Sequence, residues 1–132
     1  MNTSPGETPK VPSYVREESS HSVRVFWLEH DRLLEDIRRA AQEAGRENPL
    51  VKEIVLFGSL AERRAVPGSD ADILIVLQED HRPFLERVNE WLEKFDLGFP
   101  VEVFPYTVAE LNNPVAREAL AKGVRLYASS RG

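Results

Sequence analysis

Two aspartates lie at the start of the most apolar run of the chain, residues 71–77: Asp70 directly precedes it and Asp72 is its second residue. Alternate residues of a strand face the same side, so the two carboxylates project from one face while Ala71 and Ile73 point to the other. Carboxylates about 6 Å apart repel by roughly 3 kcal/mol at an effective dielectric constant of about 20. The pair becomes useful when a divalent cation lies between the acids. A hairpin turn followed by a solvated acidic strand start is the alternative interpretation.

A third acid, Glu102, interrupts the apolar stretch at residues 100–104. Val101 and Val103 should face the core, which places Glu102 on the opposite face. Glutamate has a poor β-propensity, so this side chain is either simply exposed or directed at a positive group. If its strand neighbours the strand at residues 71–77, the three acids form one cluster that would require a metal ion. In a chain without cysteine, oxygen ligands select Mg²⁺ or Mn²⁺ over zinc.

Gly58 and Ser59 follow a run of β-branched and aromatic residues, 51–57, where a strand should end. A glycine there lets the backbone approach a ligand closely, and free N–H groups at such a turn form an anion-binding concavity. On its own the dipeptide is more often an ordinary turn. Ser59 could also act as a helix N-cap, and that role is compatible with ligand binding.

Apolar periodicity predicts the helices that surround these residues. Apolar side chains recur at helical spacing from Trp27 through Leu34 to Ala44, so we expect a first helix that ends near residues 45–49. Two further amphipathic helices are expected at residues 84–95 and 115–122.

Strands are expected at residues 51–57, 71–77, 101–106 and 124–128. Pro105 indicates that the third of these lies at an edge or contains a bulge. Thr107 and Glu110, which follow it, have the spacing of a capping box.

The element order α-β-β-α-β-α-β indicates an α/β domain in which helices flank a mixed sheet of three to four strands. Residues 21–132 would form this single domain, because 132 residues suffice for one compact unit. Residues 1–20 hold three of the nine prolines and almost no apolar periodicity, so we expect a flexible N-terminal tail.

Composition argues against several classes of protein. The chain has 17 basic and 22 acidic residues, a net charge of −5 and no basic stripe, so direct binding of duplex nucleic acid is not expected. No apolar run approaches the ~20 residues of a membrane span, and the first residues do not resemble a signal peptide. The absence of cysteine removes thiol chemistry and fits a cytoplasmic location. Neither a GxGxxG nor a P-loop lysine motif is present.

Other candidate residues indicate less. The three histidines are spaced too irregularly to form a metal site, and His30 is expected on the surface of the first helix. Trp27 is most simply a core or subunit-interface aromatic.

The Gly-Ser pair that begins at Gly58 and the Asp-x-Asp triplet that begins at Asp70 are separated by ten residues. Together they match the GSx10DxD signature of the nucleotidyltransferase (DNA polymerase β-like) superfamily. The wider string LFGSLAERRAVPGSDADILIVL, residues 56–77, resembles the minimal nucleotidyltransferase (MNT) domains. The resemblance covers about residues 33–128 and implies the nucleotidyltransferase fold.

The resemblance implies a role for each matching residue. Gly58 and Ser59 would hold the triphosphate of ATP. Asp70 and Asp72 would bind Mg²⁺, while Glu102 would bind a second metal ion and help to deprotonate the attacking hydroxyl. The implied chemistry is two-metal phosphoryl transfer, in which the protein itself forms no covalent bond.

The chain departs from the family pattern in three places. Related domains commonly read GSxARG, whereas here Glu62 stands where an arginine is usual and Arg63 replaces a turn glycine. Glu62 would weaken ATP binding unless Arg63 or Arg64 compensates its charge, so both arginines are candidate nucleotide-binding residues. Glu102 is one methylene longer than the aspartate frequent at its position, which shifts the metal geometry.

The implied function is Mg²⁺-dependent transfer of AMP from ATP to an acceptor hydroxyl. Stand-alone MNT domains pair with a separately encoded HEPN protein, a ribonuclease toxin, and can adenylylate one of its tyrosines. The resemblance therefore implies the antitoxin of a type VII-like toxin–antitoxin pair, acting in a hetero-oligomer. A single small domain also leaves little room for an acceptor site of its own. The alternatives are a non-catalytic antitoxin with a degenerate nucleotide site, suggested by Glu62, and a small-molecule nucleotidyltransferase.

Overall fold

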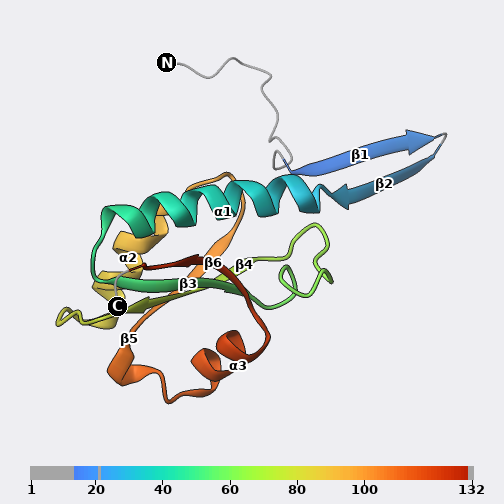
Figure 1. The fold of residues 1–132 in the computed structure, drawn as a ribbon. Helices are drawn as coiled ribbons and strands as arrows, with labels where there is room; N and C mark the ends of the chain where they lie inside the picture. Colours follow the sequence, from blue (N-terminus) through green and yellow to red (C-terminus); the bar gives the residue numbers. More distant parts are fainter. Residues whose placement is uncertain (1–13, 21, 131–132) are drawn as a thin grey trace.

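The computed structural model describes residues 14–20 and 22–130. At its centre is a four-stranded sheet with the strand order β5-β4-β3-β6 (Figure 1). The strands are β3 (Val51–Phe57), β4 (Ala71–Leu77), β5 (Val101–Thr107) and β6 (Val124–Ala128). β3 is antiparallel to β4 and β6, whereas β4 and β5 are parallel. The structure confirms the predicted α/β class and mixed sheet.

Helices cover both faces of this sheet (Figure 1). α1 (His30–Glu47) and α2 (Phe84–Lys94) pack on one face, and α3 (Pro114–Lys122) packs on the other. Because side chains alternate along a strand, β4 contributes to two cores. Ile73 and Ile75 pack with α1 and α2, whereas Leu74 and Val76 pack with α3.

The connection between β5 and α3 follows the sequence prediction. Pro105 lies in β5, which is an edge strand. Thr107 and Glu110 form the capping box, here around a single 3₁₀ turn, η1 (Val108–Glu110). Asn113 caps α3 by accepting a hydrogen bond from the Ala116 N–H at 2.9 Å.

The residues before α1 differ from the prediction. They form an antiparallel hairpin of β1 (Val15–Ser20) and β2 (Val23–Leu28), where the sequence predicted part of a flexible tail and the start of a helix. Trp27 lies in β2 opposite Arg16 and is 44% exposed, so the prediction that Trp27 belongs to the first helix was wrong. β2 is rich in β-branched and aromatic residues, which favour a strand, and pairing with β1 selects that conformation. The expectation for residues 1–13 lies outside the described residues.

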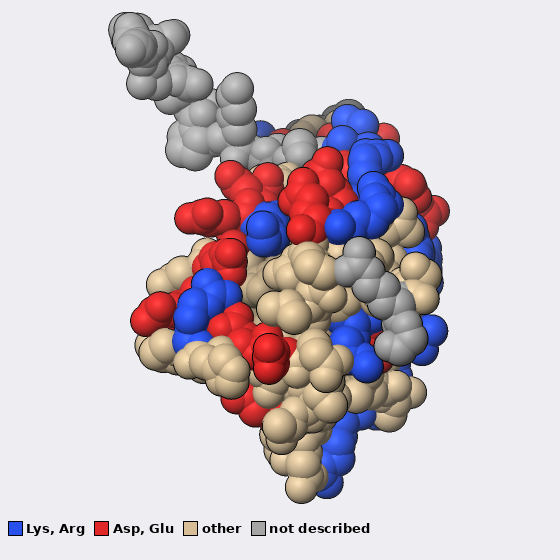
Figure 2. Space-filling view, turned by 60° about the vertical axis from the view of Figure 1, so that its left-hand side comes forward, with Lys and Arg blue, Asp and Glu red and all other residues tan. Residues whose placement is uncertain are grey.

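The surface carries both signs of charge. On the face shown in Figure 2, acidic and basic side chains lie close together and border a large area of uncharged residues. In the described part of the chain, no helix is both long enough and apolar enough to cross a bilayer.

Candidate active site

Asp72 and Glu102 are direct cross-strand neighbours. Asp72 of β4 pairs with Glu102 of the parallel strand β5 and, on its other side, with Phe57 of β3. Leu74 and Phe104, two positions further along each strand, pack against α3, so both acids project from the α3 face of the sheet. The structure therefore brings Glu102 beside Asp72, as predicted for neighbouring strands.

The Asp72 carboxyl lies in a negative environment. Its pKa is raised to about 6, first because the group is partly buried and then because Glu102, Asp70 and Glu118 carry like charges near it. A hydrogen bond with Glu102 adds to the shift, because it favours the protonated form. Asp70 and Glu102 are both exposed. Asp70, Asp72 and Glu102 are therefore close enough for their charges to interact, and in this sense they form an acidic cluster.

Gly58 lies against this cluster. It directly follows β3 and has a φ of +81°, a backbone conformation that favours glycine. A Cβ atom at this position would collide with the carboxylate of Asp72. Gly58 therefore permits a close approach between the backbone after β3 and Asp72, while the close approach of this backbone to a ligand stays a prediction.

Ser59 begins a tight turn rather than a helix. The Glu62 N–H donates to the Gly58 carbonyl at 3.1 Å, and the Arg64 N–H donates to the Ser59 carbonyl at 2.8 Å. No helix begins here in the described chain, so the interpretation of Ser59 as an N-cap was wrong.

The first turn of α1 holds this loop in place. His30 Nε2 makes a 2.8 Å hydrogen bond with the Leu60 carbonyl oxygen, and the Arg63 guanidinium donates to Asp31 at 2.9 Å. The His30 side chain is only 15% exposed, so the expectation of a histidine on the helix surface was wrong. Helical periodicity could not show this contact, because it joins residues thirty positions apart.

Arg63 and Arg64 have partners within the protein. Arg63 has a φ of +59°, so the position at which related domains carry a turn glycine keeps a glycine-like backbone here. Arg64 donates to Glu62 at 3.2 Å, so the Glu62 carboxylate has a basic partner within the loop. The side chains of Arg63 and Arg64 are 59% and 63% exposed, and their role in nucleotide binding stays a prediction.

Glu118 is an acidic neighbour of Asp72 that the sequence analysis did not identify. It lies on α3, the helix that covers the face from which Asp72 projects. In the sequence it is one charged residue on the polar side of a short helix, and no spacing relates it to the motif. Only the packing of α3 on the sheet reveals its position.

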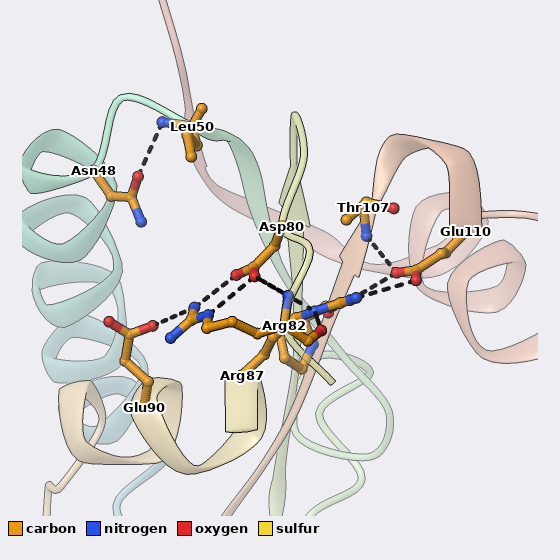
Figure 3. A network of polar contacts seen from close by, with 9 residues as sticks. Asn48, Leu50, Asp80, Arg82, Arg87, Glu90, Thr107 and Glu110 are labelled. Atoms are coloured by element: carbon orange, nitrogen blue, oxygen red, sulfur yellow. Dashed lines mark hydrogen bonds and ion pairs between the residues drawn. The ribbon is translucent and has the colours of Figure 1, made fainter. Parts of the chain in front are cut away.

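A second polar cluster lies at the opposite end of β4 and β5 (Figure 3). Arg87 of α2 is buried and donates to Glu110 at 2.7 and 3.2 Å and to the Pro105 carbonyl at 3.1 Å. Arg82 donates to Asp80 at 2.6 Å. These ion pairs hold the pKa of both carboxyls, Asp80 and Glu110, down at about 2. The cluster joins α2 to the ends of two strands, which is a structural role.

The acids near Gly58 fit a divalent cation in their chemistry. Asp70, Asp72 and Glu102 offer only carboxylate oxygens, the ligands of Mg²⁺ and Mn²⁺. Burial and then the nearby like charges raise the pKa of Asp72, and a bound cation would offset the repulsion among these charges. Among the described residues, no three His, Cys, Asp or Glu side chains are arranged so that they could hold a metal ion without moving. Binding would therefore require side-chain rotation, for which the exposed Asp70 and Glu102 have room.

Comparison with known families and curated proteins gives two matches in sequence. Residues 37–126 match the family model described as a nucleotidyltransferase domain. A candidate protein adenylyltransferase of Methanocaldococcus jannaschii, MJ1379, is 31% identical over 91 residues, which cover 66% of this chain and 87% of the relative.

Solved structures give matches in fold. A candidate nucleotidyltransferase from Sulfolobus solfataricus aligns with a TM-score of 0.60 at 20% identity, covering 78% of this chain and 86% of that one. A Shewanella oneidensis complex of a tri-AMPylated HEPN toxin with an MNT antitoxin gives a TM-score of 0.40 at 16% identity, covering 76% of this chain and 70% of the matched one. The first of these likenesses shows the fold.

Proposed function

The chain belongs to the nucleotidyltransferase family, and from that premise we propose that it transfers AMP from ATP to a hydroxyl group on a partner protein. The observation that supports this most directly is the pairing of Asp72 with Glu102 across β4 and β5, with the Gly58 backbone against Asp72. A glycine backbone and two acids thus lie together at one end of the sheet, and this supports the proposed adenylyl transfer.

Each residue of the site has a proposed role. Gly58 and Ser59 bind the triphosphate, since Gly58 has no side chain that would keep the phosphates away from the backbone. Asp70, Asp72 and Glu102 hold the divalent cation, Mg²⁺ or Mn²⁺. When bound, such cations polarise the phosphoryl oxygens and stabilise the pyrophosphate that leaves. Glu102, exposed on the edge strand, accepts the proton of the attacking hydroxyl.

Two observations favour a protein as the acceptor. The relative from Methanocaldococcus jannaschii is described as a candidate protein adenylyltransferase, and this chain covers 87% of its length. The string at residues 56–77 resembles the MNT domains that act with HEPN toxins. The proposed acceptor is therefore a tyrosine of a HEPN partner, and the proposed setting is a toxin–antitoxin pair.

The test is an AMP-transfer assay with ATP labelled at the α-phosphate, Mg²⁺ and the product of the neighbouring gene. We expect label on the partner, on a tyrosine that peptide mass spectrometry identifies. The double variant Asp70→Asn/Asp72→Asn should lose at least about 99% of transfer, because removing electrostatic stabilisation costs about 10²-fold or more. Glu86→Gln/Glu93→Gln, which neutralises two exposed acids of α2, is the matched control and should retain it.

The same assay separates catalysis from binding alone. Glu62 suggested a non-catalytic antitoxin, and its ion pair with Arg64 at 3.2 Å supports the catalytic alternative. A partner that is neutralised but never labelled would overturn the proposed catalysis. Label that appears only on a small-molecule alcohol, and never on protein, would overturn the proposed acceptor.

A further inference from the structure

The β1–β2 hairpin extends away from the body of the domain (Figure 1). Beyond its base, the residues described in both strands are exposed. β2 nevertheless has apolar side chains at five of its six positions. Four of these are between 44% and 59% exposed: Val23, Val25, Phe26 and Trp27. A two-stranded hairpin is marginally stable alone, and an apolar strand with an open edge is a template for further pairing.

The base of the hairpin is firmly fixed to the domain. The Tyr14 hydroxyl donates to Asp36 at 2.8 Å, and the Glu29 N–H donates to the Tyr14 carbonyl at 2.6 Å. Arg16 donates to Glu29 at 2.7 Å, and Tyr14 itself is buried against the ring of Phe99. The hairpin is therefore held out from the domain in a defined direction.

We propose that the open edge of β2 pairs with the β2 edge of a second copy of this chain. The two strands would run antiparallel about a two-fold axis and join the hairpins into one four-stranded sheet. This proposal does not depend on the proposed function, because the hairpin contributes none of the acids of the site.

Charge distinguishes β2 from β1 as the pairing edge. β1 carries Glu17 and Glu18 at its centre. If β1 paired with β1 of a second copy along most of its length, glutamates of the two copies would therefore lie opposite each other, which is unfavourable. β2 has one charged residue, Arg24, which is already paired with Glu17 at 2.8 Å. Pairing β1 of one copy with β2 of the next is a head-to-tail contact, which would extend into a filament rather than close as a dimer.

The faces of β2 also complement each other about a two-fold axis. Val23, Val25 and Trp27 are alternate residues, so they share one face. When the axis passes near Val25, Val23 of one copy lies opposite Trp27 of the other. Aromatic and β-branched residues make favourable cross-strand pairs, so the dimer would extend one continuous apolar face.

The first test measures molar mass by light scattering after gel filtration, over a series of concentrations of the full chain. We expect twice the chain mass of 15.0 kDa. Val25→Lys should shift the protein to the monomer. The hairpin should survive this change, because the residue opposite Val25 within the hairpin is Glu18, which would pair with the new ammonium group. Ser20→Lys adds the same charge to β1 and should leave the dimer intact.

The second test uses the absence of cysteine from the chain. With a short bismaleimide reagent, Val25→Cys should crosslink two copies, whereas Ser20→Cys on β1 should not at the same concentration. A monomer at every concentration would overturn the proposal, as would a dimer that Val25→Lys leaves unchanged. Crosslinking of Val25→Cys only to a different protein would assign the edge to that partner and would also overturn it.

Discussion

At Gly58, the backbone conformation and the contact with Asp72 are separate constraints that two variants can distinguish. Gly58→Ala places a Cβ against the Asp72 carboxylate at a φ of +81°. Gly98→Ala is the matched control, because Gly98 has a φ of +75° and no atom lies within 4 Å of the position that a Cβ would take there. We expect Gly98→Ala to lose about 1–2 kcal/mol of unfolding free energy in urea. Gly58→Ala should lose more and should also lose AMP transfer, and equal losses with full activity would contradict this.

Arg63 occupies a backbone conformation that costs a non-glycine residue about 1 kcal/mol. Its pair with Asp31 is exposed, and such pairs contribute little to stability. Arg63→Gly should therefore leave the unfolding free energy unchanged or raise it by up to about 1 kcal/mol. Arg64→Gly, at a residue without a positive φ, should lower it by about 0.5–1 kcal/mol. Chemical denaturation of both variants measures the difference, and equal losses would show that the loop does not favour glycine at Arg63.

Among the elements, α2 is joined to β5 through Arg87. Arg87 is 5% exposed and bonds to Glu110 and to the Pro105 carbonyl. Arg87→Met keeps the aliphatic length but leaves these acceptors without their donor, so we expect a loss of about 2–3 kcal/mol in urea unfolding. Arg39→Met removes an exposed pair with Asp36 within α1 and should cost less than about 0.5 kcal/mol. Similar losses in both variants would contradict a structural role for Arg87.

The same cluster predicts how stability changes in acid. The pKa values of Asp80 and Glu110 are about 2 in the folded protein, below their unfolded values. The ion pairs therefore contribute stability that is complete above about pH 4.5 and is lost as the pH falls towards 2. Asp80→Asn/Glu110→Gln should lower the unfolding free energy at pH 6 and flatten its decline between about pH 4.5 and 3. Exposed Glu86→Gln is the control, and a double variant with an unchanged acid slope would contradict the assignment.

For the whole molecule, the four-stranded sheet could be predicted from the sequence better than the β1–β2 hairpin that precedes it. β4 was predictable because it is a nearly continuous apolar run, typical of a strand covered on both faces, and β3 was predictable because it is rich in β-branched and aromatic residues. The closeness of Asp72 and Glu102 could be predicted only if their strands are adjacent in the sheet. The parallel pairing of β4 with β5 fulfils this condition. Local patterns thus locate acids on strands, while strand order decides which acids meet.

The features that the sequence did not predict depend on long-range contacts. Trp27 satisfies a helical spacing with Leu34 and a strand spacing with Val25, and only the pairing of β2 with β1 decides between them. Glu118 reaches the acids because α3 packs on the sheet, and no local pattern encodes that packing.

At this same scale, ligand binding should stabilise the entire fold, because a ligand that binds only the native state shifts the unfolding equilibrium. With ATP and Mg²⁺ at about 100 times the dissociation constant, the gain is about 2.7 kcal/mol, which raises the Tm of a domain of this size by on the order of 10 °C. Scanning fluorimetry should show this shift for the unmodified chain and for Glu86→Gln/Glu93→Gln. Removal of the cation with EDTA, or the change Asp70→Asn/Asp72→Asn, should abolish most of it, because both remove the charges that join the phosphates to the acids. An ATP-induced shift that persists in EDTA and in the double aspartate variant would place nucleotide binding elsewhere on the protein.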